Sequence, residues 1–150
     1  MSANIYPIYP IAPYAVAASL SATTACATRA PVPVANLAAN NIIQLVPANV
    51  GAGNGVRIDK IQVQGSSSSE TAATTAGLVT IWMNDGTNAW VIDEIQMTGV
   101  TPSATTPSEN KYHTYTNLVL PATYSLYVST SVTTTASTNA ISVQAFGGTY

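Results

Sequence analysis

The chain has 150 residues, of which 47% are hydrophobic and only 7% are charged, and its formal net charge is −2 at pH 7. An ordinary globular domain carries about 25% charged residues. Here 23 Ala, 21 Thr, 14 Ser and 11 Asn supply small and neutral polar side chains instead. Disordered chains combine low hydrophobicity with high net charge, so this composition predicts a folded chain. The length suits one domain with one hydrophobic core.

Charge and cysteine content exclude several classes of function. The basic residues are too few and too scattered to neutralise a run of phosphates, so we expect no nucleic-acid partner. They are Arg29, Arg57, Lys60 and Lys111. No basic helix is present, and prolines interrupt the apolar N-terminal stretch, so we expect neither a membrane partner nor a signal peptide. Cys26 is the only cysteine, which excludes an intramolecular disulfide.

The N-terminal residues 5–13 read IYPIYPIAP, a three-residue repeat. Polyproline II has three residues per turn, so the repeat predicts a rod roughly 28 Å long with three apolar edges. Water solvates such a rod poorly, and we expect it to dock either on its own domain, as an edge strand, or on a neighbouring molecule. The candidate interface residues are Ile5, Tyr6, Pro7, Ile8, Tyr9, Pro10, Ile11, Pro13 and Tyr14.

The segment from Ala15 to Ala30 consists mainly of Ala, Ser and Thr, and two prolines follow it. Its threonines weaken a helix, and it has few large apolar residues, so it predicts an extended arm or loop. We therefore divide the chain into an extended Pro/Ala/Thr-rich N-terminal arm, residues 1–40, and a β-sandwich domain, residues 41–150.

The first strands of the predicted sandwich cover residues 42–46 and 56–64. In the second of these, VRIDKIQVQ, the apolar residues change parity between Ile58 and Ile61. Successive side chains of a strand point to opposite faces, so the change predicts a β-bulge near Asp59 and Lys60.

A hairpin is predicted where residues 78–83 and 89–97 flank the sequence NDGTN, because Asp-Gly tolerates the positive φ of a tight turn. Trp82 and Trp90 lie on either side of this turn. We interpret them as core or cross-strand packing residues. In an alternative interpretation they stack on a sugar or another ligand.

Further strands with period-two alternation are predicted at residues 112–120, 124–129 and 141–145. The total is seven or eight strands separated by turns, with no convincing amphipathic helix. This pattern predicts an all-β fold, an antiparallel two-sheet sandwich of the jelly-roll type with an extended N-terminal arm.

The residues needed for catalysis are mostly missing. His113 is the only candidate base, and no serine has the sequence context of a nucleophile elbow. One Cys and one His exclude an ordinary zinc site. The Asn84, Asp85 and Asn88 cluster could hold calcium, but a hairpin turn explains the same residues. We therefore expect no enzymatic activity, no cofactor and no metal.

Asp93 and Glu94 are adjacent, so in a strand they point to opposite faces and cannot easily act as paired carboxylates. One of them should point inward unless the strand lies at an edge, in a bulge or at an interface. Lys60, Arg57 and Lys111 are its candidate partners.

One part of the chain resembles a known group of proteins. The stretch TAGLVTIWMNDGTNAWVIDEIQMTGVTPSATTPS, the segment NLVLPATYSLYVST and the glycine pair near the C-terminus are similar to small structural proteins of tailed bacteriophages. The resemblance covers roughly residues 71–150. It implies a virion component of β-sandwich type, with the role of a head decoration or cement protein.

Such a protein is made in the host cytoplasm and binds the outer head shell, where it reinforces capsomer contacts. The implied partners are the major capsid protein and further copies of the chain, with a trimer favoured and a dimer as the alternative. A carbohydrate- or receptor-binding module of a tail or surface appendage is the second hypothesis, with Trp82 and Trp90 as its stacking residues. A tail-tube or connector subunit is the third.

Overall fold

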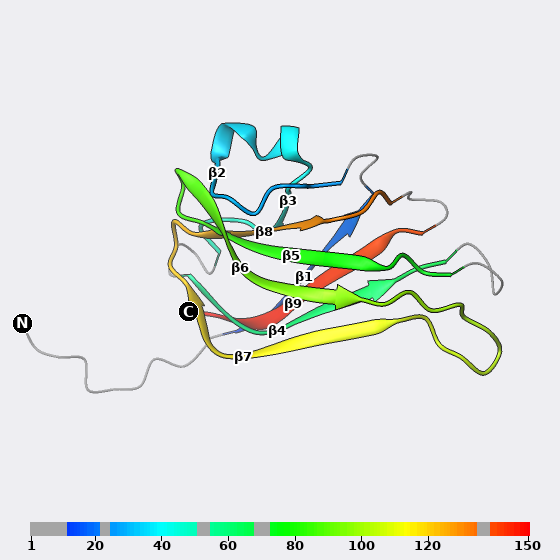
Figure 1. Ribbon diagram of the computed structural model, residues 1–150. Coiled ribbons are helices and arrows are strands. Elements are labelled where there is room, and N and C mark those ends of the chain that lie inside the picture. The colour runs from blue at the N-terminus through cyan, green and yellow to red at the C-terminus, as the bar shows by residue number, and fades with distance from the viewer. Residues whose placement is uncertain (1–11, 22–24, 51–54, 68–72, 135–138) are drawn as a thin grey trace, which may run out of the picture.

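The computed structural model describes residues 12–21, 25–50, 55–67, 73–134 and 139–150. They form two antiparallel sheets that pack face to face (Figure 1). Sheet A has the order β1 (Ala12–Leu20), β9 (Ile141–Thr149), β4 (Val56–Gly65) and β7 (Asn110–Leu120). Sheet B has the order β2 (Val32–Pro33), β6 (Asn88–Met97), β5 (Gly77–Asn84), β8 (Ser125–Thr130) and β3 (Ile43–Val46).

The strand order is that of a jelly roll. Apart from the short β2, the strands pair first with last: β1 with β9, β3 with β8, β4 with β7 and β5 with β6. This is the pairing of one long hairpin wound into two sheets. The predicted fold class, an antiparallel two-sheet sandwich, is confirmed.

The main core lies between the two sheets and is built by alternate residues of each strand. In β9, Ile141, Val143 and Ala145 are buried, whereas the residues between them are partly exposed, as the period-two pattern predicts. The other strands contribute in the same way. The largest fully buried side chains of this core include Leu20, Ile58, Ile61, Ile81, Ile95, Met97, Leu120 and Leu126.

The predicted bulge in β4 is confirmed, because the register of β4 shifts between Ile58 and Lys60 against both of its neighbours. Beside the bulge, Gly147 of β9 pairs with Ile58. A Cβ atom at Gly147 would lie 1.8 Å from the backbone oxygen of Arg57. Only glycine therefore lets the two backbones approach this closely.

The hairpin of β5 and β6 is also confirmed. The Asp85 carboxylate accepts hydrogen bonds from the backbone N–H groups of Thr87, at 2.8 Å, and Asn88, at 2.9 Å, and these bonds lower the pKa of Asp85. Gly86 has a φ of 97°. These turn contacts account for the acidic and amide residues of NDGTN.

A second, smaller apolar cluster covers the outer face of sheet B. The segment that includes β2 and the two 3-10 turns, η1 (Val34–Asn36) and η2 (Ala38–Asn40), lies on the side of sheet B away from sheet A (Figure 1). Its buried residues Cys26, Val32, Leu37 and Ile42 pack with Trp82 and Ala89 of the sheet. The indole Nε1 of Trp82 donates a hydrogen bond of 2.9 Å to the hydroxyl of Ser129. The chain thus covers the part of this face around Trp82 and Ala89 with its own residues.

The N-terminal boundary differs from the predicted one at residue 40. β1 lies within the predicted arm, yet it pairs with β9 over its nine residues, and Leu20 is fully buried. The prediction missed β1 because small residues dominate it, which weakens the apolar alternation. Residues 5–11 of the candidate interface lie outside the described residues.

We predict that Gly147→Ala lowers the free energy of unfolding by at least about 2 kcal/mol, because the strands must separate to admit the new methyl group. Denaturant titration measures the change. Ser142→Ala, on the partly exposed side of the same strand, is the control and should change stability by less than about 0.5 kcal/mol. Equal stability of the Gly147→Ala and Ser142→Ala proteins would contradict the close approach.

Candidate interaction surface

Sheet A presents an outer face that no described segment of the chain covers. We call this surface the A face. Its residues alternate with the buried ones and line up across the four strands by their registers. They are Pro13, Ala15, Ala17 and Ser19 of β1, Ser142, Gln144 and Phe146 of β9, Arg57, Lys60, Gln62 and Gln64 of β4, and Asn110, Tyr112, Thr114 and Val119 of β7.

The charged groups of the A face are neutralised or held locally. Arg57 Nε donates to Asp59 Oδ1 at 2.7 Å. Lys60 Nζ donates to Gln62 Oε1 at 3.1 Å and lies 4.5 Å from the centre of the Phe146 ring. Docking costs most where it strips water from an unpaired charge. The Arg57–Asp59 pair lowers this cost, whereas Lys60 is held by uncharged groups alone among its described contacts.

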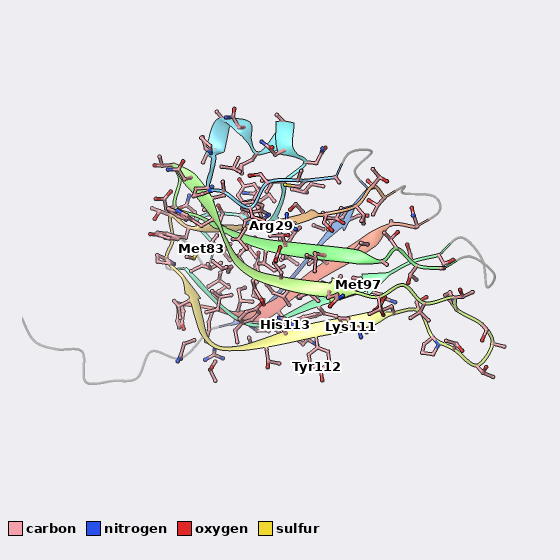
Figure 2. The ribbon with its side chains drawn as sticks, in the orientation of Figure 1. Arg29, Met83, Met97, Lys111, Tyr112 and His113 are labelled. Carbon is pink, nitrogen blue, oxygen red and sulfur yellow. The ribbon has the colours of Figure 1, made fainter. Side chains whose placement is uncertain are left out.

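A shallow apolar hollow lies on this face, along β1 and β9. It has a volume of about 210 Å³ and is lined by Ala15, Val16, Ala17, Gln144 and Phe146. Toward the other edge of the face, Tyr112 is 62% exposed, and Figure 2 shows it projecting away from the sandwich. Aromatic residues are enriched, and charged residues depleted, in the centres of protein interfaces.

The described residues of the candidate arm interface have different environments. Pro13 is exposed and belongs to the A face. Tyr14 instead packs against the main core, and burial raises the pKa of its phenol. Tyr14 is thus a structural residue of β1.

The two tryptophans do not form a common stacking platform. Trp82 has 0% exposure and is closed beneath the segment that covers sheet B. Trp90 is partly exposed and pairs with Met83, whose side chain packs on the main core, on the opposite face of the sheet from Trp82. The structure therefore rules out Trp82 as a stacking residue and leaves Trp90.

A cluster of polar side chains joins the edges of the two sheets where β6 lies near β7. The Asp93 carboxylate of β6 accepts a hydrogen bond of 2.5 Å from the hydroxyl of Tyr115, and its Oδ2 lies 2.7 Å from His113 Nδ1. Burial acts to raise the pKa of Asp93, but these hydrogen bonds and the one from the Glu94 N–H outweigh it and keep the pKa below its ordinary value. Burial and the Asp93 charge raise the pKa of Tyr115 strongly, so its phenol remains a donor.

This cluster corrects the expected pairing of the two acids. Asp93 does point inward, but its partners are His113 and Tyr115, so the expectation of Lys60, Arg57 or Lys111 was wrong. Glu94 points outward, where it binds Arg29 and accepts a hydrogen bond of 3.1 Å from Thr80. The two adjacent acids thus serve different faces of β6.

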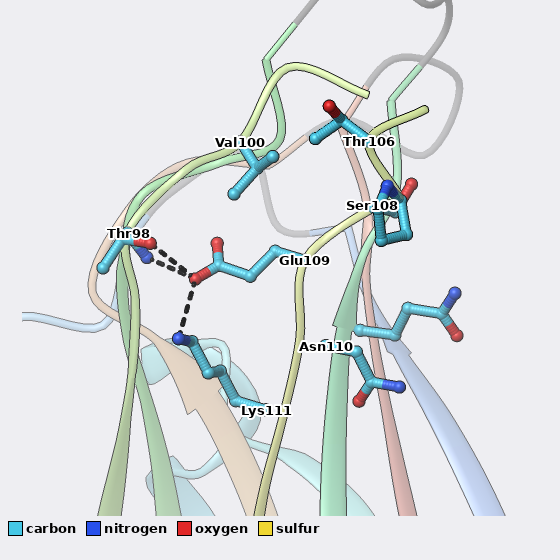
Figure 3. Close-up of a pocket in the computed structure, with 9 residues that line it drawn as sticks. Thr98, Val100, Thr106, Ser108, Glu109, Asn110 and Lys111 are labelled. Carbon is cyan, nitrogen blue, oxygen red and sulfur yellow. Dashed lines mark hydrogen bonds and ion pairs between the residues drawn. The ribbon is translucent and has the colours of Figure 1, made fainter. Parts of the chain in front are cut away.

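A larger hollow of about 690 Å³ lies where β6 ends and β7 begins (Figure 3). Its buried acid, Glu109, accepts hydrogen bonds from the N–H and hydroxyl of Thr98, at 2.8 and 2.7 Å, and from the N–H of Gly99, at 2.8 Å. Lys111 Nζ lies 3.8 Å away. Burial acts to raise the pKa of Glu109, but these partners keep it lowered.

Sequence reasoning missed Glu109, because its partners are ten residues or more away along a loop. Its carboxylate oxygens are engaged by the chain, so Glu109 anchors this loop to the start of β7. Within the described ranges, no three His, Cys, Asp or Glu side chains gather as a metal site would require. The same ranges contain no helix with the length and hydropathy needed to span a membrane.

We predict that Asp93→Asn lowers the free energy of unfolding at pH 7 by about 1–3 kcal/mol, because it removes a charge that two side chains bind. The folded-state pKa of Asp93 is lowered, so its contribution is present above the unfolded pKa of about 4 and is lost as the pH falls through the folded value. Denaturant titration at pH 7 and pH 2 measures both effects.

Asp59→Asn, at an exposed ion pair, is the matched control and should cost less than about 1 kcal/mol. If Asp93→Asn lowers the free energy of unfolding as much at pH 2 as at pH 7, the carboxylate charge does not stabilise this edge.

The chain has no match among known protein-family models, curated proteins or solved structures. Its resemblance to phage structural proteins therefore depends on the motifs quoted above.

Proposed function

We propose that this chain is a non-enzymatic structural protein of a virion, a decoration or cement protein that binds the outer head shell of a tailed bacteriophage. Its partners are the major capsid protein and further copies of itself. The observation that carries the proposal is the A face, which no described segment covers and whose two cations, Arg57 and Lys60, are held by Asp59 and Gln62. The quoted sequence motifs supply the link to phage particles.

The contrast between the two outer faces supports this proposal. The chain covers the outer face of sheet B around Trp82 and Ala89 with its own apolar cluster. The outer face of sheet A has no such cover from the described residues, and it carries small, amide and aromatic side chains. An ordinary globular domain has about 25% charged residues, whereas this chain has 7%. The A face is therefore suited to contact another protein surface.

Repetition on a shell strengthens such contacts. Each copy presents the same face, and neighbouring copies on a closed lattice hold one another at high effective concentration. Individually weak contacts then add, so the protein requires neither strong surface charge nor a deep pocket.

The polar cluster at β6 and β7 supports a structural role for the sole histidine. His113 binds Asp93 across the sandwich, and Asp93 also binds the protonated Tyr115. We propose that these residues hold the two sheets together. The protein then acts by binding alone.

We predict that quantitative mass spectrometry of purified particles will find hundreds of copies of this chain per particle, because a head lattice offers that many equivalent sites. The major capsid protein in the same sample provides the internal standard. A handful of copies would contradict head decoration and favour a tail or surface appendage.

We also predict that deleting residues 1–11 leaves the unfolding midpoint unchanged but abolishes binding to undecorated heads. β1 begins at Ala12, so this deletion spares its pairing with β9 and the packing of Tyr14. Co-sedimentation with heads measures binding, and thermal unfolding is the control for folding. Heads that bind the truncated and complete chains equally well would contradict a role for the N-terminal segment.

A further inference from the structure

We propose that residues 5–11 of one copy bind the A face of a second copy, in the hollow between Ala17, Gln144 and Phe146. The inference deepens the proposed function by naming the partner of the N-terminal segment. It rests on that function only in treating residues 5–11 as an interface.

The chemistry of the hollow matches a proline-rich segment. Grooves that bind polyproline II combine aromatic surfaces, which contact the proline rings, with donors for the backbone carbonyls that this helix leaves free. The hollow offers the Phe146 ring and two alanines, and the side-chain amide of Gln144 stands beside them. Gln144 makes no side-chain hydrogen bond with any other described residue.

Charge also fits. The segment IYPIYPI carries no charged residue, and the nearest charged groups of the A face are locally satisfied. Lys60 is held by Gln62 and by the Phe146 ring. An uncharged segment adds no further charge to this surface, and Lys60 keeps its contacts with Gln62 and the Phe146 ring.

The segment leaves the fold at the rim of the A face. β1 begins at Ala12, and Pro13 is exposed on the face itself. The hollow begins at Ala15, two residues farther along the same strand. Ala12, where the described part of the chain begins, thus belongs to the strand that lines this hollow.

The stiffness of the segment directs it away from its own hollow. To cover Ala17 of its own chain, Ile8 would require a reversal of the backbone between residues 8 and 13. The IYPIYPIAP repeat predicts an extended segment, and an extended continuation of β1 beyond Ala12 runs away from Ala17. A second copy is therefore the occupant that the geometry favours. Since every copy has one segment and one hollow, exchange can close as a reciprocal dimer or as a ring.

Chemical cross-linking of full-length proteins tests the proposal. One protein carries Ile8→Cys and the other, isotopically labelled, carries Ala17→Cys. They are mixed at the highest soluble concentration and treated with a short bismaleimide. Cys26 is buried, 2% exposed, so the unsubstituted protein serves as the reagent control. We expect a mixed dimer linked at the two substituted positions, with a yield at least five-fold above that of a control pair.

The control pair combines Ile8→Cys with Gln96→Cys, an exposed position on the other sheet. A yield no higher than that of the control pair overturns the proposal. So does a double variant, Ile8→Cys with Ala17→Cys in one chain, that gives mainly intramolecular links on dilution, because that result places the segment on its own face.

A second measurement does not depend on cysteines. Sedimentation equilibrium should show at least ten-fold weaker self-association for Ala17→Glu than for Gln96→Glu, with unchanged unfolding midpoints for both. Equal association of the two variants overturns the proposal. Binding to heads is assayed separately: trans cross-links without head binding contradict the proposed decoration role alone, and head binding without trans cross-links contradicts this inference alone.

Discussion

The pairing of β1 with β9 is the interaction on which the rest of the structure depends. It joins the first strand to the last along nine residues and so closes the wound hairpin of the jelly roll. It also completes sheet A, brings Leu20 into the main core and sets the point where the N-terminal segment leaves the fold. The hollow between Ala17, Gln144 and Phe146 exists only because these two strands lie side by side.

The two sheets use their outer faces differently. Sheet B is covered by the segment that contains β2 and the 3-10 turns, which accounts for the full burial of Trp82. Sheet A keeps an outer face of small, amide and aromatic side chains, whose few charges are satisfied within the face. On the outer face of sheet B, the unusually low charge of the chain is thus explained by internal packing. On the outer face of sheet A, the low charge is explained by the contacts that we propose for the A face.

Sequence reasoning predicted features that depend on neighbouring residues. Alternation along β9, the parity change near Asp59 and the Asp-Gly turn all lie within one strand or one hairpin, where spacing alone determines geometry. It missed β1 because Ala15, Ala17 and Ala18 give almost no contrast between the two faces of the strand.

The sequence pattern does not predict contacts between the two sheets. Alternation shows that Asp93 and Glu94 occupy opposite faces, but it shows neither which of them points inward nor that β7 lies opposite. The pairing with His113 and Tyr115 therefore required the three-dimensional arrangement. The same holds for Glu109, whose donors Thr98 and Gly99 come from the end of β6 and the loop that follows it.

The central claim is that the A face is covered in the assembled state. An electron cryomicroscopy map of decorated heads, with this structure fitted into the density of each copy, tests that claim most directly. We expect the A face to lie against the shell or a neighbouring copy, with the outer face of sheet B toward solvent. Copies bound through sheet B, with Ala17, Gln144 and Tyr112 in open solvent, would contradict it.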